Sequence, residues 1–92
     1  MATVTVTLPS LLDPVMGGVR EVEARGDTLS QVLEDLLDRE PRLRPHLFQE
    51  SGELRQHVLC FFNGTNSRWL EGQDPPVREG DTVLFMQAVT GG

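Results

Sequence analysis

Lysine is absent from the sequence, so arginine supplies all eight of the strongly basic side chains. Without a lysine amine, the chain cannot form a Schiff base with a carbonyl substrate or hold a phosphate through a lysine. The charge balance is acidic, with a formal net charge of −6 at pH 7. An acidic surface repels phosphate backbones, which argues against a nucleic-acid partner and favours a protein with a basic docking surface.

Cysteine and long apolar runs are equally scarce. The single cysteine, Cys60, cannot form a disulfide within the chain, which is typical of a reducing compartment. No apolar run approaches the ~18 residues of a membrane span, and no basic residue precedes an apolar stretch at the N-terminus. We therefore expect a cytoplasmic protein. Its 92 residues suffice for one domain and one hydrophobic core.

Recognisable catalytic motifs are also missing. The sequence has no HExxH, paired CxxC or GxSxG pattern, and His46 and His57 flank no obvious nucleophile. One cysteine and two histidines are poor support for a metal site. Cys60 lies between Leu59 and Phe61, which favours a buried, inert thiol over a sulfur-carrying one. We expect neither enzymatic activity nor a bound metal or cofactor.

Hydrophobic periodicity predicts one main helix and five strands in the order β-β-α-β-β-β. A capping box of Thr28 and Gln31 begins the helix, an apolar face at 3–4 spacing follows, and Pro41 ends it. The predicted strands occupy residues 3–8, 19–24, 57–62, 68–70 and 82–89. A short helical turn around residues 46–48 is predicted in the connection to the third strand. One helix covering one face of a small sheet makes an α+β two-layer domain.

The last predicted strand is apolar on both faces. Val83 and Phe85 point to one side of the sheet, while Leu84 and Met86 point to the other. The third strand, at 57–62, has the same property. A single helix cannot cover both faces, so the second face needs another explanation.

Two explanations for the second face remain open. The connection at 41–55 covers it, or an apolar patch lies exposed there and binds a protein. On the second explanation, strand parity makes Leu59, Phe61, Leu84 and Met86 the candidate docking residues. If Val83 and Phe85 face solvent instead, the assignment inverts.

The apolar last strand runs into a pair of glycines, in the stretch "FMQAVTGG". Small residues at a chain end are common where no structure depends on them. The alternative is that the terminus is itself the functional group. Glycine has no Cβ, so Gly91 and Gly92 can thread a narrow channel, and a glycine carboxylate is open to attack from either side.

These features together resemble the ThiS/MoaD group of ubiquitin-like sulfur carriers. The resemblance covers essentially the whole chain and includes the strand-helix order, the "EGDTV" turn, the apolar last strand and the terminal "VTGG". The stretches "VTVTLPSLL" and "GGVREVEARGDTLSQVLEDL", with the long middle connection, are most similar to the CysO type. The "AVTGG" ending is equally similar to small subunits of molybdopterin synthase.

The resemblance implies a β-grasp fold. Residues 1–89 would form the domain, with a mixed sheet of four to five strands, the last strand central and one main helix packed on one face. Residues 90–92 would form a free C-terminal Gly-Gly tail. The protein would be a carrier that acts with separate enzymes and binds no cofactor of its own.

The resemblance also implies a chemistry. An E1-like activating enzyme using ATP and magnesium would adenylate Gly92, and a sulfur donor would then displace AMP to leave a thiocarboxylate. A second enzyme would accept the sulfur, typically a pyridoxal-phosphate enzyme of the cysteine synthase kind or another thiolating synthase. Gly91, Thr90 and Val89 would form the segment that threads into the partner. The alternatives are a molybdopterin synthase subunit, a ubiquitin-like modifier that forms isopeptide bonds, and a plain adaptor with an incidental Gly-Gly end.

Overall fold

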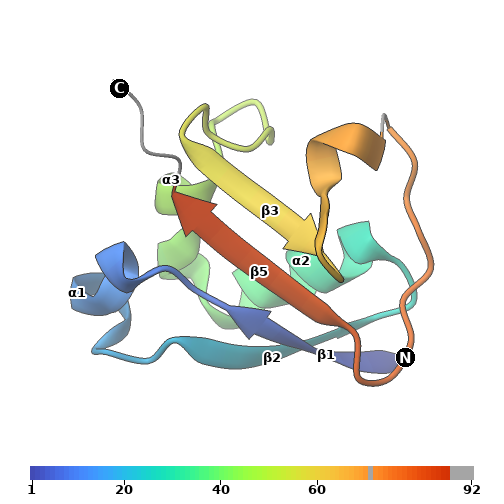
Figure 1. The fold of residues 1–92 in the computed structure, drawn as a ribbon. Coiled ribbons are helices and arrows are strands. Elements are labelled where there is room, and N and C mark those ends of the chain that lie inside the picture. The colour runs from blue at the N-terminus through green and yellow to red at the C-terminus, as the bar shows by residue number, and fades with distance from the viewer. Residues whose placement is uncertain (71, 88–92) are drawn as a thin grey trace.

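The computed structural model describes residues 1–70 and 72–87, which form one mixed sheet with helices against one of its faces (Figure 1). The strands are β1 (Ala2–Thr7), β2 (Glu21–Gly26), β3 (Val58–Phe62), β4 (Thr65–Asn66) and β5 (Thr82–Gln87). The α-helices are α1 (Asp13–Met16), α2 (Leu29–Arg39) and α3 (Arg44–Leu47). The 3₁₀ helices are η1 (Ser10–Leu12), η2 (Pro41–Leu43) and η3 (Ser67–Leu70).

The sheet has the strand order β2-β1-β5-β3-β4, so the last strand is central, as expected. β1 and β5 run parallel, and the other three pairings are antiparallel. α2 lies between β2 and β3 in the chain and crosses behind the sheet (Figure 1). This α+β arrangement confirms the predicted β-grasp fold with its five strands and one main helix.

The N-terminus of α2 is held by side chains from two segments. The Thr28 hydroxyl accepts a 3.4 Å hydrogen bond from the Gln31 amide, as a capping box requires. The Gln31 side chain reaches back to the amide of Asp27 at 2.8 Å, one residue further than the usual box. Asp74 accepts hydrogen bonds from the Ser30 amide at 2.8 Å and hydroxyl at 2.6 Å, and these lower the pKa of Asp74. The helix is thereby tied to the loop that precedes β5.

Gly26 lets β2 approach the first turn of α2. A Cβ at this position would lie 2.7 Å from the Val32 amide nitrogen and 2.8 Å from the Gln31 Cβ. Real Cβ atoms do not come so close to backbone, so a glycine is needed where this strand meets the helix.

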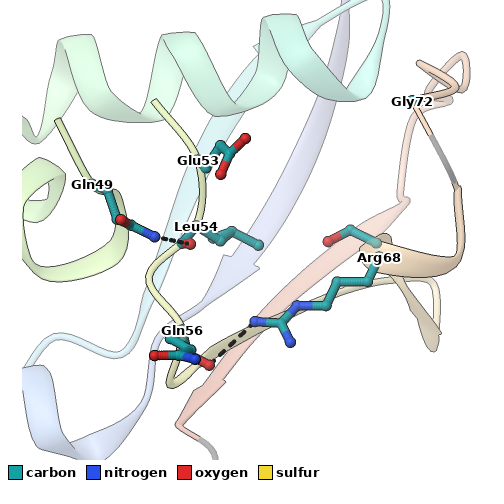
Figure 2. Close-up of a pocket in the computed structure, with 7 residues that line it drawn as sticks. Gln49, Glu53, Leu54, Gln56, Arg68 and Gly72 are labelled. Carbon is teal, nitrogen blue, oxygen red and sulfur yellow. Dashed lines mark hydrogen bonds between the residues drawn. The ribbon is translucent and has the colours of Figure 1, made fainter. Parts of the chain in front are cut away.

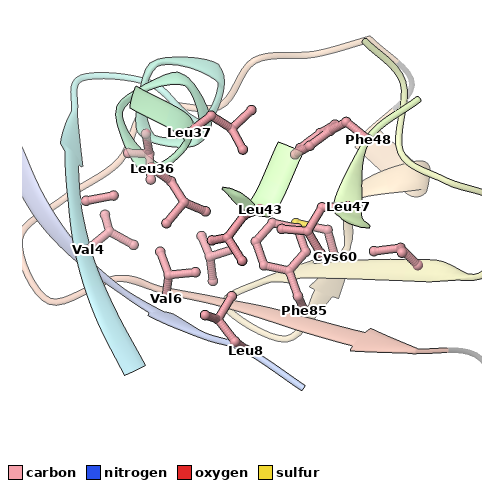
Figure 3. Close-up of a cluster of buried hydrophobic side chains, with 14 of the residues drawn as sticks. Val4, Val6, Leu8, Leu36, Leu37, Leu43, Leu47, Phe48, Cys60 and Phe85 are labelled. Carbon is pink, nitrogen blue, oxygen red and sulfur yellow. The ribbon is translucent and has the colours of Figure 1, made fainter. Parts of the chain in front are cut away.

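The core lies between the sheet and the helices (Figure 3). Phe85 is fully buried and packs edge-to-face against Phe48, with ring centroids 6.5 Å apart and planes at 79°. The largest fully buried side chains come from both layers: Val4, Val6, Val32, Leu36, Leu43, Leu47, Cys60, Val83 and Phe85. No buried residue of the described chain is polar or charged.

One predicted strand is wrong. Residues 68–70 belong to the 3₁₀ helix η3, and the short fourth strand lies earlier, at Thr65–Asn66. The Asn66 side chain accepts a 3.0 Å hydrogen bond from the Arg68 amide, a local bond that turns the chain out of the extended conformation. Nor is the stretch buried: η3 has no buried residue, and Trp69 is 74% exposed.

The other boundaries differ by small amounts. β1, β2 and β3 begin within two residues of the predicted starts, and β5 begins at Thr82 as predicted. The helical turn predicted in the middle connection is α3, preceded by η2. The part of the last predicted strand beyond Gln87 lies outside the described residues.

Candidate functional site

The two sides of β5 are both apolar, but one is buried and the other is exposed to solvent. Val83 and Phe85 are fully buried beneath the helices, whereas Leu84 is 36% exposed and Met86 45% exposed. The parity predicted from the sequence is confirmed, so the alternative in which Val83 and Phe85 face solvent is excluded. The face of the sheet away from the helices is called the outer face below.

β3 places two more apolar side chains beside those of β5 on the outer face. Leu59 pairs with Met86, and Phe61 pairs with Leu84, across the antiparallel ladder. Directly opposite side chains in such a ladder have Cβ atoms about 5 Å apart. Leu59 and Phe61 are half-buried. The four candidate docking residues therefore form one contiguous apolar patch on two neighbouring strands.

The middle connection does not cover this patch. Its apolar residues Leu43, Leu47 and Phe48 are buried on the helix side, where Phe48 meets Phe85 (Figure 3). The connection thus extends the helical layer over the half of the sheet that α2 does not reach. Of the two explanations for the second face, the exposed patch is the one that the structure shows.

Leu11 belongs beside the patch and was not predicted to do so. It lies on η1, is 62% exposed, and lines a groove of about 460 Å³ together with Leu84, Met86 and Gln87. Its neighbour Leu12 is buried. The doubled leucine of "SLLD" was the available signal, since one short helical turn cannot bury both side chains on the same side.

Cys60 is a core residue, as expected. It is fully buried, and its burial raises the pKa of the thiol to about 11 against a weaker opposing hydrogen bond to Ser67. A buried thiol that stays protonated at neutral pH is a poor nucleophile. The structure gives Cys60 a packing role.

The histidines form no reactive cluster. His46 and His57 are both exposed. Across residues 1–70 and 72–87, no group of three or more His, Cys, Asp and Glu side chains is arranged to hold a metal ion. Nor does the described part contain a helix with the length and hydrophobicity to cross a bilayer.

Figure 2 shows a hollow that is lined mostly by polar residues. It has a volume of about 660 Å³ and lies between the middle connection and η3. Two of its side chains are engaged with backbone: Gln49 donates to the Leu54 carbonyl at 3.2 Å, and Arg68 donates to the Gln56 carbonyl at 3.2 Å (Figure 2). Ser67 supplies the lining's one hydroxyl, and no histidine lines the hollow to activate it.

The predicted carrier group and threading segment cannot be placed. Gly92, Gly91, Thr90 and Val89 lie outside the described residues. The last described residue, Gln87, pairs with Val58 at the end of β5, next to the outward-facing Met86. The apolar patch therefore lies on the strand that leads directly to the predicted carrier group.

A family model and a characterised relative match the chain over nearly its whole length. The model of the ThiS family matches residues 6–92. The sulfur carrier protein CysO of Mycobacterium tuberculosis is 35% identical over 91 residues, which is 97% of this chain and 98% of that protein. The crystal structure of M. tuberculosis CysO superposes with a TM-score of 0.80 and 34% identity, over 94% of this chain and 99% of that chain.

Two further solved structures are similar to the same degree. One is the crystal structure of the BexX/CysO complex of Amycolatopsis orientalis, with a TM-score of 0.80 and 31% identity over 97% of this chain and 99% of the matched chain. The other is the small archaeal modifier protein 1 (SAMP1) of Methanosarcina acetivorans, with a TM-score of 0.80 and 30% identity over 100% of this chain and 98% of that chain. The chain therefore belongs to the ThiS family of sulfur carriers, with proteins of the CysO type among its relatives.

Proposed function

We propose that this chain carries sulfur as a thiocarboxylate on Gly92. The carboxylate oxygen would attack the α-phosphorus of ATP on an E1-like enzyme, releasing pyrophosphate and leaving an acyl-adenylate. A sulfur nucleophile would then attack the acyl carbon and release AMP. The observation that carries the proposal is the match to the ThiS family, which extends through the Gly-Gly pair to residue 92.

The chain's own contribution is to present this group. Two consecutive glycines leave the acyl carbon unhindered and allow the last residues to enter a narrow active site. Neither Cys60, which is buried, nor the exposed histidines are needed for a reaction whose acid-base and phosphate chemistry belongs to the partner. The domain, residues 1–89, acts as the handle for the tail at 90–92, with Val89, Thr90 and Gly91 inside the partner.

The outer face of the sheet is where the activating enzyme would dock. Leu59, Phe61, Leu84 and Met86 supply an apolar patch, and exposed patches of this kind mark protein-binding surfaces. Its position on β5 supports this role, because an enzyme seated there lies close to the segment it must take in. Leu11 enlarges the patch at the end nearest Gln87.

The sulfur acceptor would be bound by a second enzyme, such as a pyridoxal-phosphate enzyme of the cysteine synthase kind or another thiolating synthase. That the A. orientalis CysO was crystallised as a complex with BexX supports the idea that carriers of this type act while bound to a partner. The same face of this chain would serve both partners in turn, since each must reach Gly92.

A second candidate function is favoured by one observation. The similarity to SAMP1, a small archaeal modifier protein, supports a second reaction, in which an amine attacks the same adenylate, releases AMP and forms an isopeptide bond. Both functions need the same activation at Gly92. They differ in the nucleophile that reaches the acyl carbon.

Intact mass spectrometry tests the proposal. The protein is incubated with the source organism's E1-like enzyme, ATP, magnesium and a sulfide donor, and compared with a variant lacking Gly91 and Gly92. A mass gain equal to the replacement of one oxygen by sulfur, absent from the truncated variant, is the expected result. An unchanged mass, while a known carrier is converted by its own enzyme in parallel, would overturn the proposal, and conjugates of higher mass would favour the modifier.

A further inference from the structure

The outer face carries a polar half whose position is fixed by the strand register. One row of paired residues crosses all five strands in the order Glu21, Thr7, Leu84, Phe61 and Asn66. Paired residues share a face of the sheet, so Glu21 points to the same side as Leu84 and Phe61. Two strand spacings separate Glu21 from Leu84, which is roughly 10 Å.

A second carboxylate extends this acidic edge. Glu23 is paired with Thr5 on β1 and is exposed on the same face, as is Glu21. Neither Glu21 nor Glu23 forms an ion pair or a side-chain hydrogen bond within the described residues.

Two cations lie nearby on this edge. Arg20 is already engaged, since its guanidinium donates to both carboxylate oxygens of Asp13 at 3.2 and 2.9 Å. Arg25 is exposed on the same face as the glutamates but pairs with Thr3, further along β2 from the apolar patch than either carboxylate.

The two halves together form a surface of a definite kind. An apolar patch on β5 and β3 is bordered, across the threonines of β1, by two free carboxylates on β2. The whole spans four of the five strands, from β2 to β3, which is roughly 15 Å at the usual strand spacing. A partner that covers the patch would also cover or adjoin Glu21 and Glu23.

The alternatives explain less of this arrangement. Charges on an edge strand discourage pairing with other strands, but a charge of either sign would do so. A second copy of this chain is a poor occupant, because each copy carries a net charge of −6 and would bring its own carboxylates to the interface. A partner protein with a positively charged surface is the occupant that complements these carboxylates.

We propose that Glu21 and Glu23 form the acidic border of the docking face and pair with arginine or lysine side chains that flank an apolar pocket on the activating enzyme. This rests on the proposed function for the identity of the enzyme. The carboxylates act on association: they steer and orient the carrier, while Leu84 and Phe61 supply the buried contact. Glu21 and Glu23 take no part in the chemistry at Gly92.

Matched charge reversals test the proposal. The double variant Glu21→Arg/Glu23→Arg is compared with Glu34→Arg/Asp38→Arg, which makes the same change in net charge at exposed positions of α2, on the opposite side of the molecule. The neutral variant Glu21→Gln/Glu23→Gln is a third sample. The association rate with the E1-like enzyme is measured at low and high salt, and circular dichroism checks that each variant is folded.

The border variant should associate at least about tenfold more slowly than the wild type at low salt, with a smaller loss for the glutamine variant and for the α2 control. The difference should shrink at high salt. Equal losses in the border and control variants, or no loss in either, would overturn the acidic border. If the wild type is converted to the thiocarboxylate and the border variants associate as fast as the wild type, only this inference fails. If the wild type is neither bound nor converted by the E1-like enzyme, the proposed function fails as well. Self-association of the wild type through this face would also overturn it.

Discussion

The two faces of the central strand β5 are built from similar residues and have different roles. Val83 and Phe85 are fully buried between the sheet and the helices, while Leu84 and Met86, one residue away, are 36% and 45% exposed. Burial of the first pair stabilises the fold in the ordinary way. The second pair leaves apolar area in water, a cost that a binding surface explains. Mutations on the two faces should therefore affect different measurements.

The largest effect is expected on the inner face. Replacing Phe85 with alanine removes a fully buried ring and its edge contact with Phe48, so it should lower the free energy of unfolding by about 3–5 kcal/mol. Urea denaturation followed by circular dichroism measures this. A loss below about 1 kcal/mol would mean that the inner face of β5 is not the core of the domain.

A second, smaller effect is expected at alkaline pH, where ionisation of Cys60 on the inner face should lower the free energy of unfolding. Burial raises the pKa of Cys60 to about 11, so the thiol of the unfolded chain ionises at lower pH than that of the folded chain. Stability contributed by the protonated thiol is complete below pH ~9 and is lost as the pH rises towards 11, by at most about 1.4 kcal/mol per unit. The sequence has no lysine or tyrosine to titrate in the same window.

The variant Cys60→Ala isolates this contribution. Its unfolding free energy should be lower than that of the wild type at neutral pH, because a cavity forms, and should fall less steeply between pH 9 and 11. Parallel pH profiles for the two proteins would contradict the assignment of the alkaline slope to Cys60.

Asp74, in the loop before β5, is expected to stabilise the helical layer, so its loss should lower the free energy of unfolding. The Ser30 hydrogen bonds that lower the pKa of Asp74 also hold the N-terminus of α2, so Asp74→Ala should cost about 1 kcal/mol. The cost is full above pH ~4 and disappears as the pH falls through the lowered pKa of Asp74. The matched control Asp38→Ala removes an exposed carboxylate that makes no hydrogen bond within the described residues, and should change little.

The smallest effect on stability is expected on the outer face. Met86→Gln replaces a side chain that is 45% exposed, so the free energy of unfolding should change by about 0.5 kcal/mol or less. Chemical denaturation beside Phe85→Ala makes the comparison direct. If both substitutions cost the same, the two faces of β5 do not differ in the way proposed here.

The fold could be predicted where one pattern dominates. The 3–4 spacing of the helix, the alternation of β1 and the parity of β5 each determine which residues are buried. Residues 68–70 were mispredicted because the hydrogen bond that the Arg68 amide donates to the Asn66 side chain, rather than the hydrophobic pattern, sets the backbone there. Local bonds of this kind leave little trace in the sequence.

The site was predictable in part. The alternation of side chains along each strand was enough to identify the four docking candidates, Leu59, Phe61, Leu84 and Met86. Only the strand register shows that they pair with each other and that Glu21 lies in the same row as Leu84 and Phe61. The choice between the two explanations for the second face depended on which side of the sheet the middle connection packs. The pattern of Leu43, Leu47 and Phe48 indicates burial without indicating a side. Leu11 was missed because its exposure follows from a short 3₁₀ turn.

The most direct test measures the rate of thiocarboxylate formation as the concentration of carrier is varied, for the wild type and for Leu84→Gln/Met86→Gln. If the outer face docks the activating enzyme, the double variant should keep the wild-type unfolding midpoint and a similar kcat, while kcat/KM falls by about tenfold or more, since uniform binding is lost and the chemistry at Gly92 is not. Equal kcat/KM values for the two folded proteins would contradict the account.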